Sequence, residues 1–213
     1  MKPAERHRRL TRVTPRLRRH LLFAIAACSS APARPVFAQS LPLSTAADVQ
    51  FMTEMIAHHA QAVLMAGWAP THGASPAVRA LCERIVVGQR DDIVFMQRWL
   101  RDRNETVPDP GASHAPAMPG MNQEALMPGM LTGAQLADLD GARGPGFDRL
   151  FLSYMIRHHG GAITMVNRLL QTPGALRDDV MFKVAADISA DQTTEIARMQ
   201  RMLDALPDGG KSP

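Results

Sequence analysis

Residues 51–66 read FMTEMIAHHAQAVLMA, and residues 151–166 repeat this stretch as FLSYMIRHHGGAITMV. Seven of the sixteen positions are identical, where ordinary composition gives about one. A repeat that served packing alone would keep size and apolarity, and would not need imidazoles in register. The duplication therefore indicates a function as well as a fold. The identical pairs are Phe51/Phe151, Met55/Met155, Ile56/Ile156, His58/His158, His59/His159, Ala62/Ala162 and Met65/Met165.

A second repeat follows each copy of the first. It matches Gln89, Ile93, Met96, Gln97 and Leu100 with Gln192, Ile196, Met199, Gln200 and Leu203. Each half of the chain is therefore predicted to be a helical hairpin. A lone hairpin cannot bury its apolar stripe, so we expect an all-α fold in which two hairpins pack as an antiparallel four-helix bundle. A pseudo-two-fold axis would then bring the two His-His pairs towards each other.

Start and stop signals set the expected helix boundaries. Asp48 is the expected cap of the first helix, Ser75-Pro76 opens the second, and Thr132-x-x-Gln135 is a capping box for a short one. Sustained period-two alternation, the signal of strands, does not occur. The helices are expected over about 48–66, 76–103, 132–139 and 147–170, and in a last segment that ends near Leu206.

Residues 1–38 are predicted to be an export signal. They hold nine of the 24 Lys and Arg residues and one acid, and a basic start precedes an apolar run and an A-x-A-like end at Ala38. Two variants stay open: a lipoprotein box that ends at Cys28, which would tether the protein to a membrane, and a twin-arginine signal at Arg18-Arg19. Residues 39–213 carry 15 basic and 19 acidic groups, so a nucleic-acid partner is not expected. We expect a periplasmic or otherwise exported protein.

The expected domain organisation follows from these segments. After the signal is removed Cys82 is the one remaining cysteine, so no internal disulfide is expected, and we interpret Cys82 as a buried small hydrophobe. The segments are a signal over 1–38, a linker over 39–47, a bundle domain over 48–206 with a crossover over 104–146, and a disordered tail over 207–213.

The Met and His residues of the two repeats could bind a soft metal ion. Met55 precedes His58 by three residues and Met65 follows it by two turns, so each first helix presents thioethers above and below an imidazole pair. Adjacent histidines point about 100° apart and cannot share the centre of one face. Thioether with imidazole favours copper, Cu(I) above Cu(II). The candidate ligands in the bundle are Met55, His58, His59, Met65, Met96, Met155, His158, His159, Met165 and Met199.

The crossover adds a second group of candidate ligands. Its segment is rich in Pro and Gly and is expected to leave its methionines exposed, where they could capture copper at the surface; a linker with no metal role is the alternative. No Glu-x-x-His occurs, so a carboxylate-bridged di-iron bundle is not expected, and few acids are expected near the histidines. The candidates are His114, Met118, Met121, Met127 and Met130.

These motifs resemble the exported bacterial family called domain of unknown function 305. The resemblance covers about residues 46–206 and implies a ferritin-like helical bundle. It also implies copper binding, because some members are copper-binding proteins of the cell envelope linked to copper tolerance. The matching elements are Phe51-x3-Met55-Ile56-x-His58-His59-x2-Ala62-x2-Met65, its copy from Phe147 to Met165, the Gln-x3-Ile-x2-Met patterns at Gln89 and Gln192, and the Met-Pro-Gly-Met loop.

We therefore predict a non-enzymatic copper-binding protein that sequesters or buffers the ion. Imidazole must be neutral to bind metal, so copper affinity is expected to fall below about pH 6.5. A second copy of the chain or a protein that receives copper would be its partner. Two alternatives stay open: a ferritin-like metal oxidase that turns over Cu(I), and a structural bundle of the envelope that binds no metal.

Overall fold

The structure, a computed structural model, describes residues 44–111 and 126–207. The chain divides into two units, residues 1–39 and 40–213, and all described residues belong to the second. The predicted export signal with Cys28, and the candidate ligands His114, Met118 and Met121, lie outside the described residues. Within 44–111 and 126–207, no helix combines the length and apolarity that a membrane crossing requires.

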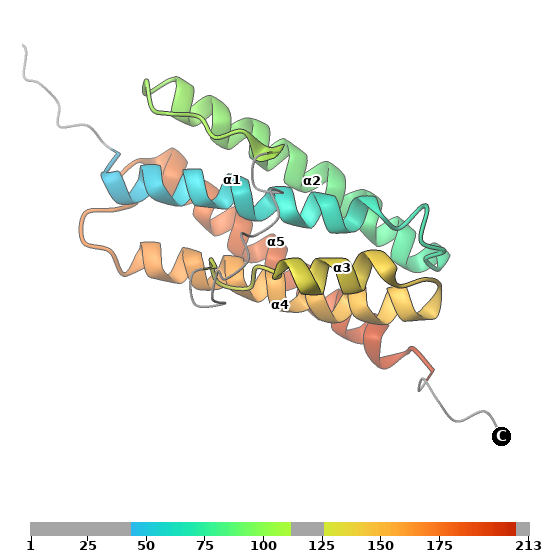
Figure 1. Cartoon of the computed structure of the whole chain (residues 1–213). Helices are drawn as coiled ribbons and strands as arrows, with labels where there is room; N and C mark the ends of the chain where they lie inside the picture. Colours follow the sequence, from blue (N-terminus) through green and yellow to red (C-terminus); the bar gives the residue numbers. More distant parts are fainter. Residues whose placement is uncertain (1–43, 112–125, 208–213) are drawn as a thin grey trace, which may run out of the picture. The chain divides into compact units, whose positions relative to one another are not determined.

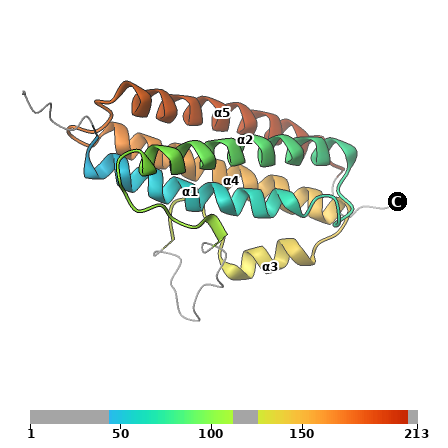
Figure 2. The ribbon, with the colours of Figure 1, turned by 90° about the horizontal axis from the view of Figure 1, so that it is seen from above.

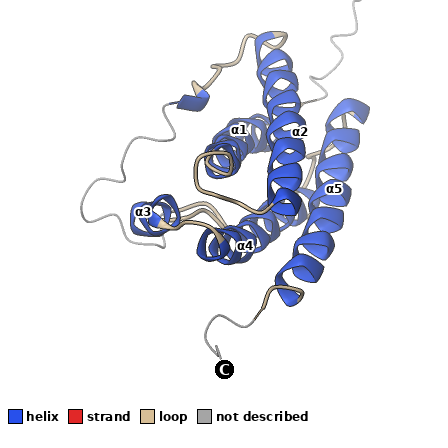
Figure 3. Cartoon of the chain, turned by 90° about the vertical axis from the view of Figure 1, so that its right-hand side faces the viewer, coloured by secondary structure: helices blue, strands red, loops and turns tan. Residues whose placement is uncertain are grey.

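Four long helices form the expected antiparallel bundle (Figure 1 and Figure 2). Helices α1 and α2 make the first hairpin, and α4 and α5 make the second. The hairpins meet mainly through α1 and α4, while α3 packs beside these two helices on the side away from α2 and α5 (Figure 3). The part of the chain that the structure describes contains no strand, which confirms the all-α class. The bounds are α1 Ala46–Gly67, α2 Pro76–Arg101, α3 Gly133–Gly141, α4 Pro145–Leu170 and α5 Asp179–Asp204.

The cap of α1 differs from the prediction. Thr45, not Asp48, is the N-cap, and the two residues form a capping box in which the Thr45 amide donates to the Asp48 carboxylate at 2.7 Å. Asp48 is buried, and its other oxygen accepts the Leu176 amide at 3.0 Å, which ties α1 to the turn between α4 and α5. The predicted caps Ser75 and Thr132 are confirmed at the starts of α2 and α3.

The buried core consists of two apolar clusters, and each contains three methionines from the two repeats. Met55, Met96 and Met165 belong to the first cluster, and Met155, Met199 and Met65 to the second. The repeat converts each member of one set into a member of the other, so the predicted pseudo-two-fold relation holds in the packing. Full burial of a methionine contributes about 1.5–3 kcal/mol. These six side chains therefore stabilise the fold whether or not a metal is bound. Cys82, as expected, is buried in the second cluster.

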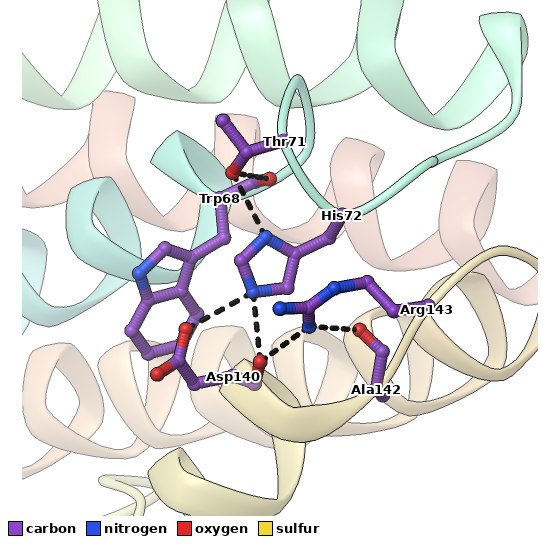
Figure 4. A network of polar contacts seen from close by, with 6 residues as sticks. All are labelled: Trp68, Thr71, His72, Asp140, Ala142 and Arg143. Carbon is purple, nitrogen blue, oxygen red and sulfur yellow. Dashed lines mark hydrogen bonds and ion pairs between the residues drawn. The ribbon is translucent and has the colours of Figure 1, made fainter.

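A buried histidine fixes the C-terminal end of the crossover to the first hairpin. His72, which follows α1, is 4% exposed, and its Nε2–H donates to the Asp140 backbone oxygen at 2.9 Å and to the Asp140 carboxylate at 3.0 Å. The Thr71 hydroxyl lies 2.9 Å from Nδ1, and the ring stacks on Trp68 (Figure 4). Arg143 also donates to the backbone oxygen of Asp140. Both nitrogens of His72 are thus satisfied, and α3 is held in place.

The loop Met127-Pro128-Gly129-Met130 contacts α4 at Gly161. A Cβ added to Gly161 would lie 2.0 Å from the Pro128 carbonyl oxygen, so only glycine permits this approach. Gly129, with φ +77°, adopts the left-handed conformation that glycine favours. On the α1 side, the Gln61 side chain both donates to and accepts from the Leu131 backbone, at 3.1 and 2.7 Å.

This contact corrects the expectation of exposure for Met127 and Met130, the two crossover methionines that the structure describes. Met130 is 9% exposed, and Met127 is half-buried against the first core cluster. The Pro and Gly residues of this segment predicted exposure. Because glycine has no side chain, they instead allow the loop backbone to pack between α1 and α4. The burial of Met127 and Met130 therefore argues against capture of metal at the surface by these two residues.

Gly161→Ala should lower the free energy of unfolding by about 1–3 kcal/mol, because the new methyl group must displace a backbone carbonyl. Gly160→Ala is the matched control: a Cβ there meets nothing within 4 Å, and alanine in a helix interior should raise stability by about 0.5–1 kcal/mol. Urea unfolding of both variants measures the difference. Equal effects of the two substitutions would show that the loop does not lie on α4.

Candidate metal centre

The two His-His pairs meet at the centre of the bundle, as the repeat predicts. The rings of His58 on α1 and His158 on α4 lie 3.9 Å apart between centroids, at an angle of 39°. All four histidines are at most 1% exposed. Along α1 they follow Met55 and precede Met65, so the histidines form a polar layer between the two methionine-containing clusters. We call these four side chains the histidine layer.

His58 has one ring nitrogen satisfied by the crossover. Its Nε2 lies 3.0 Å from the Pro128 carbonyl oxygen, which can only accept, so Nε2 carries the proton and Nδ1 is bare. Burial, and then the neighbouring His59, lowers the pKa of His58 to about 3. The ring is therefore neutral at physiological pH, which is the form that binds a metal.

Among the described residues, His158 has no hydrogen-bond partner at either ring nitrogen, although it is fully buried. Burial, followed by the proximity of His58, lowers the pKa of His158 well below its usual value. A buried polar group without a partner costs about 1–3 kcal/mol, so proteins rarely retain one without a reason. A metal ion bound to the free lone pair would supply that reason.

His59 and His159 contact the second helix of each hairpin. His59 Nε2 lies 3.2 Å from the Asp92 carboxylate on α2, and His159 Nε2 lies 2.6 Å from the Glu195 carboxylate on α5. Burial lowers the pKa of His159, although its bond to Glu195 acts in the opposite direction. The Nδ1 atoms of both rings are buried and unpartnered. The prediction that adjacent histidines cannot share one face is confirmed.

The carboxylates of Asp92 and Glu195 are residues that the sequence reasoning missed. The expectation of few acids near the histidines is wrong, because these two come from the neighbouring helices and not from the helices that carry the histidines. Buried Gln89 and Gln192 precede them by three residues, and each has at least one unpartnered amide atom. The repeated pattern Gln-x-x-acid in both second helices is the signal that could have identified them.

The donor set fits a soft ion better than a hard one. Among the described residues no group of three or more His, Cys, Asp or Glu side chains is arranged to hold a metal. The other donors that the described interior offers beside the imidazoles are the methionine thioethers. Burial raises the pKa of the Cys82 thiol, which keeps it protonated and unsuited to ligation. Imidazole and thioether together favour copper. The candidate metal ligands among the described core residues are the histidine layer and the six core methionines.

The chain is similar to known proteins in both sequence and structure. The family model described as Domain of unknown function (DUF305) matches residues 48–203. A DUF305 fragment from Deinococcus radiodurans is 29% identical, with 76% of this chain and 99% of that chain covered and a TM-score of 0.65. A DUF305 protein from Streptomyces coelicolor, described as secreted, is 25% identical, with coverages of 78% and 98% and a TM-score of 0.63.

A copper-bound structure is also among the similar folds. CopM in its Cu(II)-bound form is 30% identical, with 74% of this chain and 95% of CopM covered and a TM-score of 0.58. CopM has also been solved with Cu(I) and with silver. No curated protein matches the chain.

Acidification from pH 7 to 5.5 should destabilise the metal-free protein by about 1 kcal/mol for each of His58 and His158, whose pKa values burial lowers. The unfolded chain takes up protons near pH 6.5, whereas folded His58 takes up none until about pH 3, so acid favours the unfolded state. Stability is thus retained above about pH 6.5 and lost as the pH falls towards 3. Urea unfolding across this range should show a weaker pH dependence in His58→Gln/His158→Gln than in wild type. An unchanged dependence would contradict the burial of neutral rings.

Proposed function

The chain belongs to the DUF305 family, and we propose that it is an exported protein that binds copper inside its helical bundle and thereby sequesters or buffers the ion. The leader sequence supports export, as does the similarity to a DUF305 protein described as secreted. The similarity to CopM, which has been solved with Cu(I) and Cu(II), supports copper as the ion. The histidine layer supports the location.

The observation that carries the proposal is the state of His158. A fully buried imidazole with both nitrogens unpartnered, 3.9 Å from a second neutral imidazole, destabilises the metal-free fold. Packing alone would be served better by an apolar side chain at this position. A copper ion that accepts the lone pairs of these rings would offset the cost of burying them.

The binding site would draw on thioethers as well as imidazoles. Met55 and Met65 stand on either side of the histidines along α1, and their counterparts Met155 and Met165 do the same along α4. None of these groups carries charge, so the site suits a singly charged soft ion, Cu(I), better than a hard divalent one. We include Met96 and Met199 as further donors from α2 and α5.

The crossover would form the entrance to this interior. Met127 and Met165 line the same cleft of about 340 Å³, together with Glu54 and Arg168. A thioether on the loop and a thioether in the core thus border one opening, and a soft ion could pass between them. In this proposal Met127 is a transfer ligand and not a surface capture site.

Sequestration is favoured over oxidation of the ion. A metal oxidase must admit a metal substrate and oxygen repeatedly to one site, and the four histidines are at most 1% exposed. Steady oxygen consumption by the protein in the presence of excess Cu(I) would show that the enzyme alternative is right.

His158→Leu should weaken Cu(I) binding at least tenfold, because a ligand is lost. It should leave the metal-free protein equally stable, or more stable by up to about 2 kcal/mol, because an unpartnered polar group is removed. Anaerobic Cu(I) titration with a competing chelator measures the first effect, and urea unfolding of the metal-free protein measures the second. Competition with Zn(II) tests the preference for a soft ion.

His72→Leu is the matched control, since His72 is also a buried histidine but has both nitrogens satisfied. This variant should lose about 1–3 kcal/mol of stability and keep its copper affinity. The opposite pattern, with copper affinity kept in His158→Leu and stability lost, would make His158 a structural residue and overturn the proposed site.

A further inference from the structure

We infer that Asp92 and Glu195 are positioning residues, which hold His59 and His159 in the tautomer that leaves the buried Nδ1 atom of each ring free to bind an ion. The inference rests on the proposed function for the identity of the ion. The tautomer itself does not depend on any metal, so it can be tested in the metal-free protein.

The hydrogen bonds determine which nitrogen carries the proton. A neutral imidazole has one N–H donor and one bare acceptor nitrogen, and an ionised carboxylate can only accept. The contact of His59 Nε2 with Asp92, at 3.2 Å, therefore places the proton on Nε2. The shorter contact of His159 with Glu195, at 2.6 Å, does the same for the second ring. In both rings Nδ1 is left with a lone pair.

The opposite side of each ring, which carries Nδ1, lies in the apolar interior. Both Nδ1 atoms are inaccessible to solvent and have no partner. A doubly protonated ring would bury a second N–H group with no acceptor, which is unfavourable in an apolar interior. The neutral ring avoids this and presents a lone pair, which is what a metal needs.

The carboxylates of Asp92 and Glu195 reach solvent. The side chain of Asp92 is 45% exposed and that of Glu195 is 23% exposed. Both line a groove of about 420 Å³ between α2 and α5. Each carboxylate is thus hydrated on one side and accepts the ring N–H on the other.

The same pairing of a carboxylate with a histidine occurs in both hairpins. Asp92 and Glu195 occupy matched positions in the two hairpins, three residues after Gln89 and Gln192. Their side chains differ by one methylene, yet both reach the imidazole of their own hairpin. His58 is held in the same tautomer by another acceptor, the Pro128 carbonyl oxygen. Three of the four rings in the layer therefore have a bare Nδ1.

The test compares three substitutions that each remove one negative charge. In Asp92→Asn and Glu195→Gln the new amide can donate to Nε2 as well as accept from it, so the tautomer is no longer fixed. Asp191→Asn is the control, because Asp191 lines the same groove but makes no hydrogen bond to a histidine. Asp92→Glu restores the carboxylate and should rescue the effect.

Two measurements are made on each variant. Nitrogen-15 NMR of the histidine rings, recorded without metal at neutral pH, should show protonated Nε2 and bare Nδ1 for His59 and His159 in wild type. It should show a mixture of tautomers for the affected ring in Asp92→Asn or Glu195→Gln. Anaerobic Cu(I) titration should show a 10- to 100-fold loss of affinity in these two variants, and no such loss in Asp191→Asn or Asp92→Glu.

The outcomes separate this inference from the proposed function. Protonated Nδ1 in the wild-type rings would overturn the inference, as would equal copper affinity in all variants. An equal loss in Asp191→Asn would also overturn it, because the effect would then be one of charge alone. Failure of wild type to bind copper would overturn the proposed function, while the spectra of the metal-free protein would still decide the tautomer.

Discussion

The contact between His58 and His158 at the centre of the bundle is the constraint on which the rest of the structure depends. Two imidazoles 3.9 Å apart in an apolar interior cannot both be charged, and burial keeps them neutral. Every neighbouring feature is compatible with that state: methionine clusters lie above and below, and hydrogen-bond acceptors hold the other rings. A polar layer of this kind lowers the stability of the metal-free fold, so an ion that bound to these rings would stabilise the protein.

The methionines connect this layer to the fold. Because the repeat places three of them in each core cluster, they pack the bundle and also place soft donors before and after the histidines along α1 and α4. A thioether serves both roles well, since it is apolar enough to bury and polarisable enough to bind a soft ion. A copper site can therefore be built here without introducing any buried charge besides the ion itself.

The sequence predicts the bundle and the meeting of the histidines because a duplicated hairpin has few ways to bury its apolar stripe. It does not predict the contacts of His59 with Asp92 or of His159 with Glu195. Those depend on how far each second helix is rotated about its axis, which the packing of the whole bundle decides. The burial of Met127 is missed for a similar reason. It depends on Gly161, which is distant in sequence and allows the loop to approach α4.

The low pKa values change what limits metal binding. An exposed imidazole competes with protons near pH 6.5, and this was the expected acid limit for copper affinity. Folded His58 binds no proton until about pH 3, so an ion that reaches it displaces none over most of the acidic range. Selection at such a site would rest on the softness of the ion and on its access past Met127, and much less on acidity.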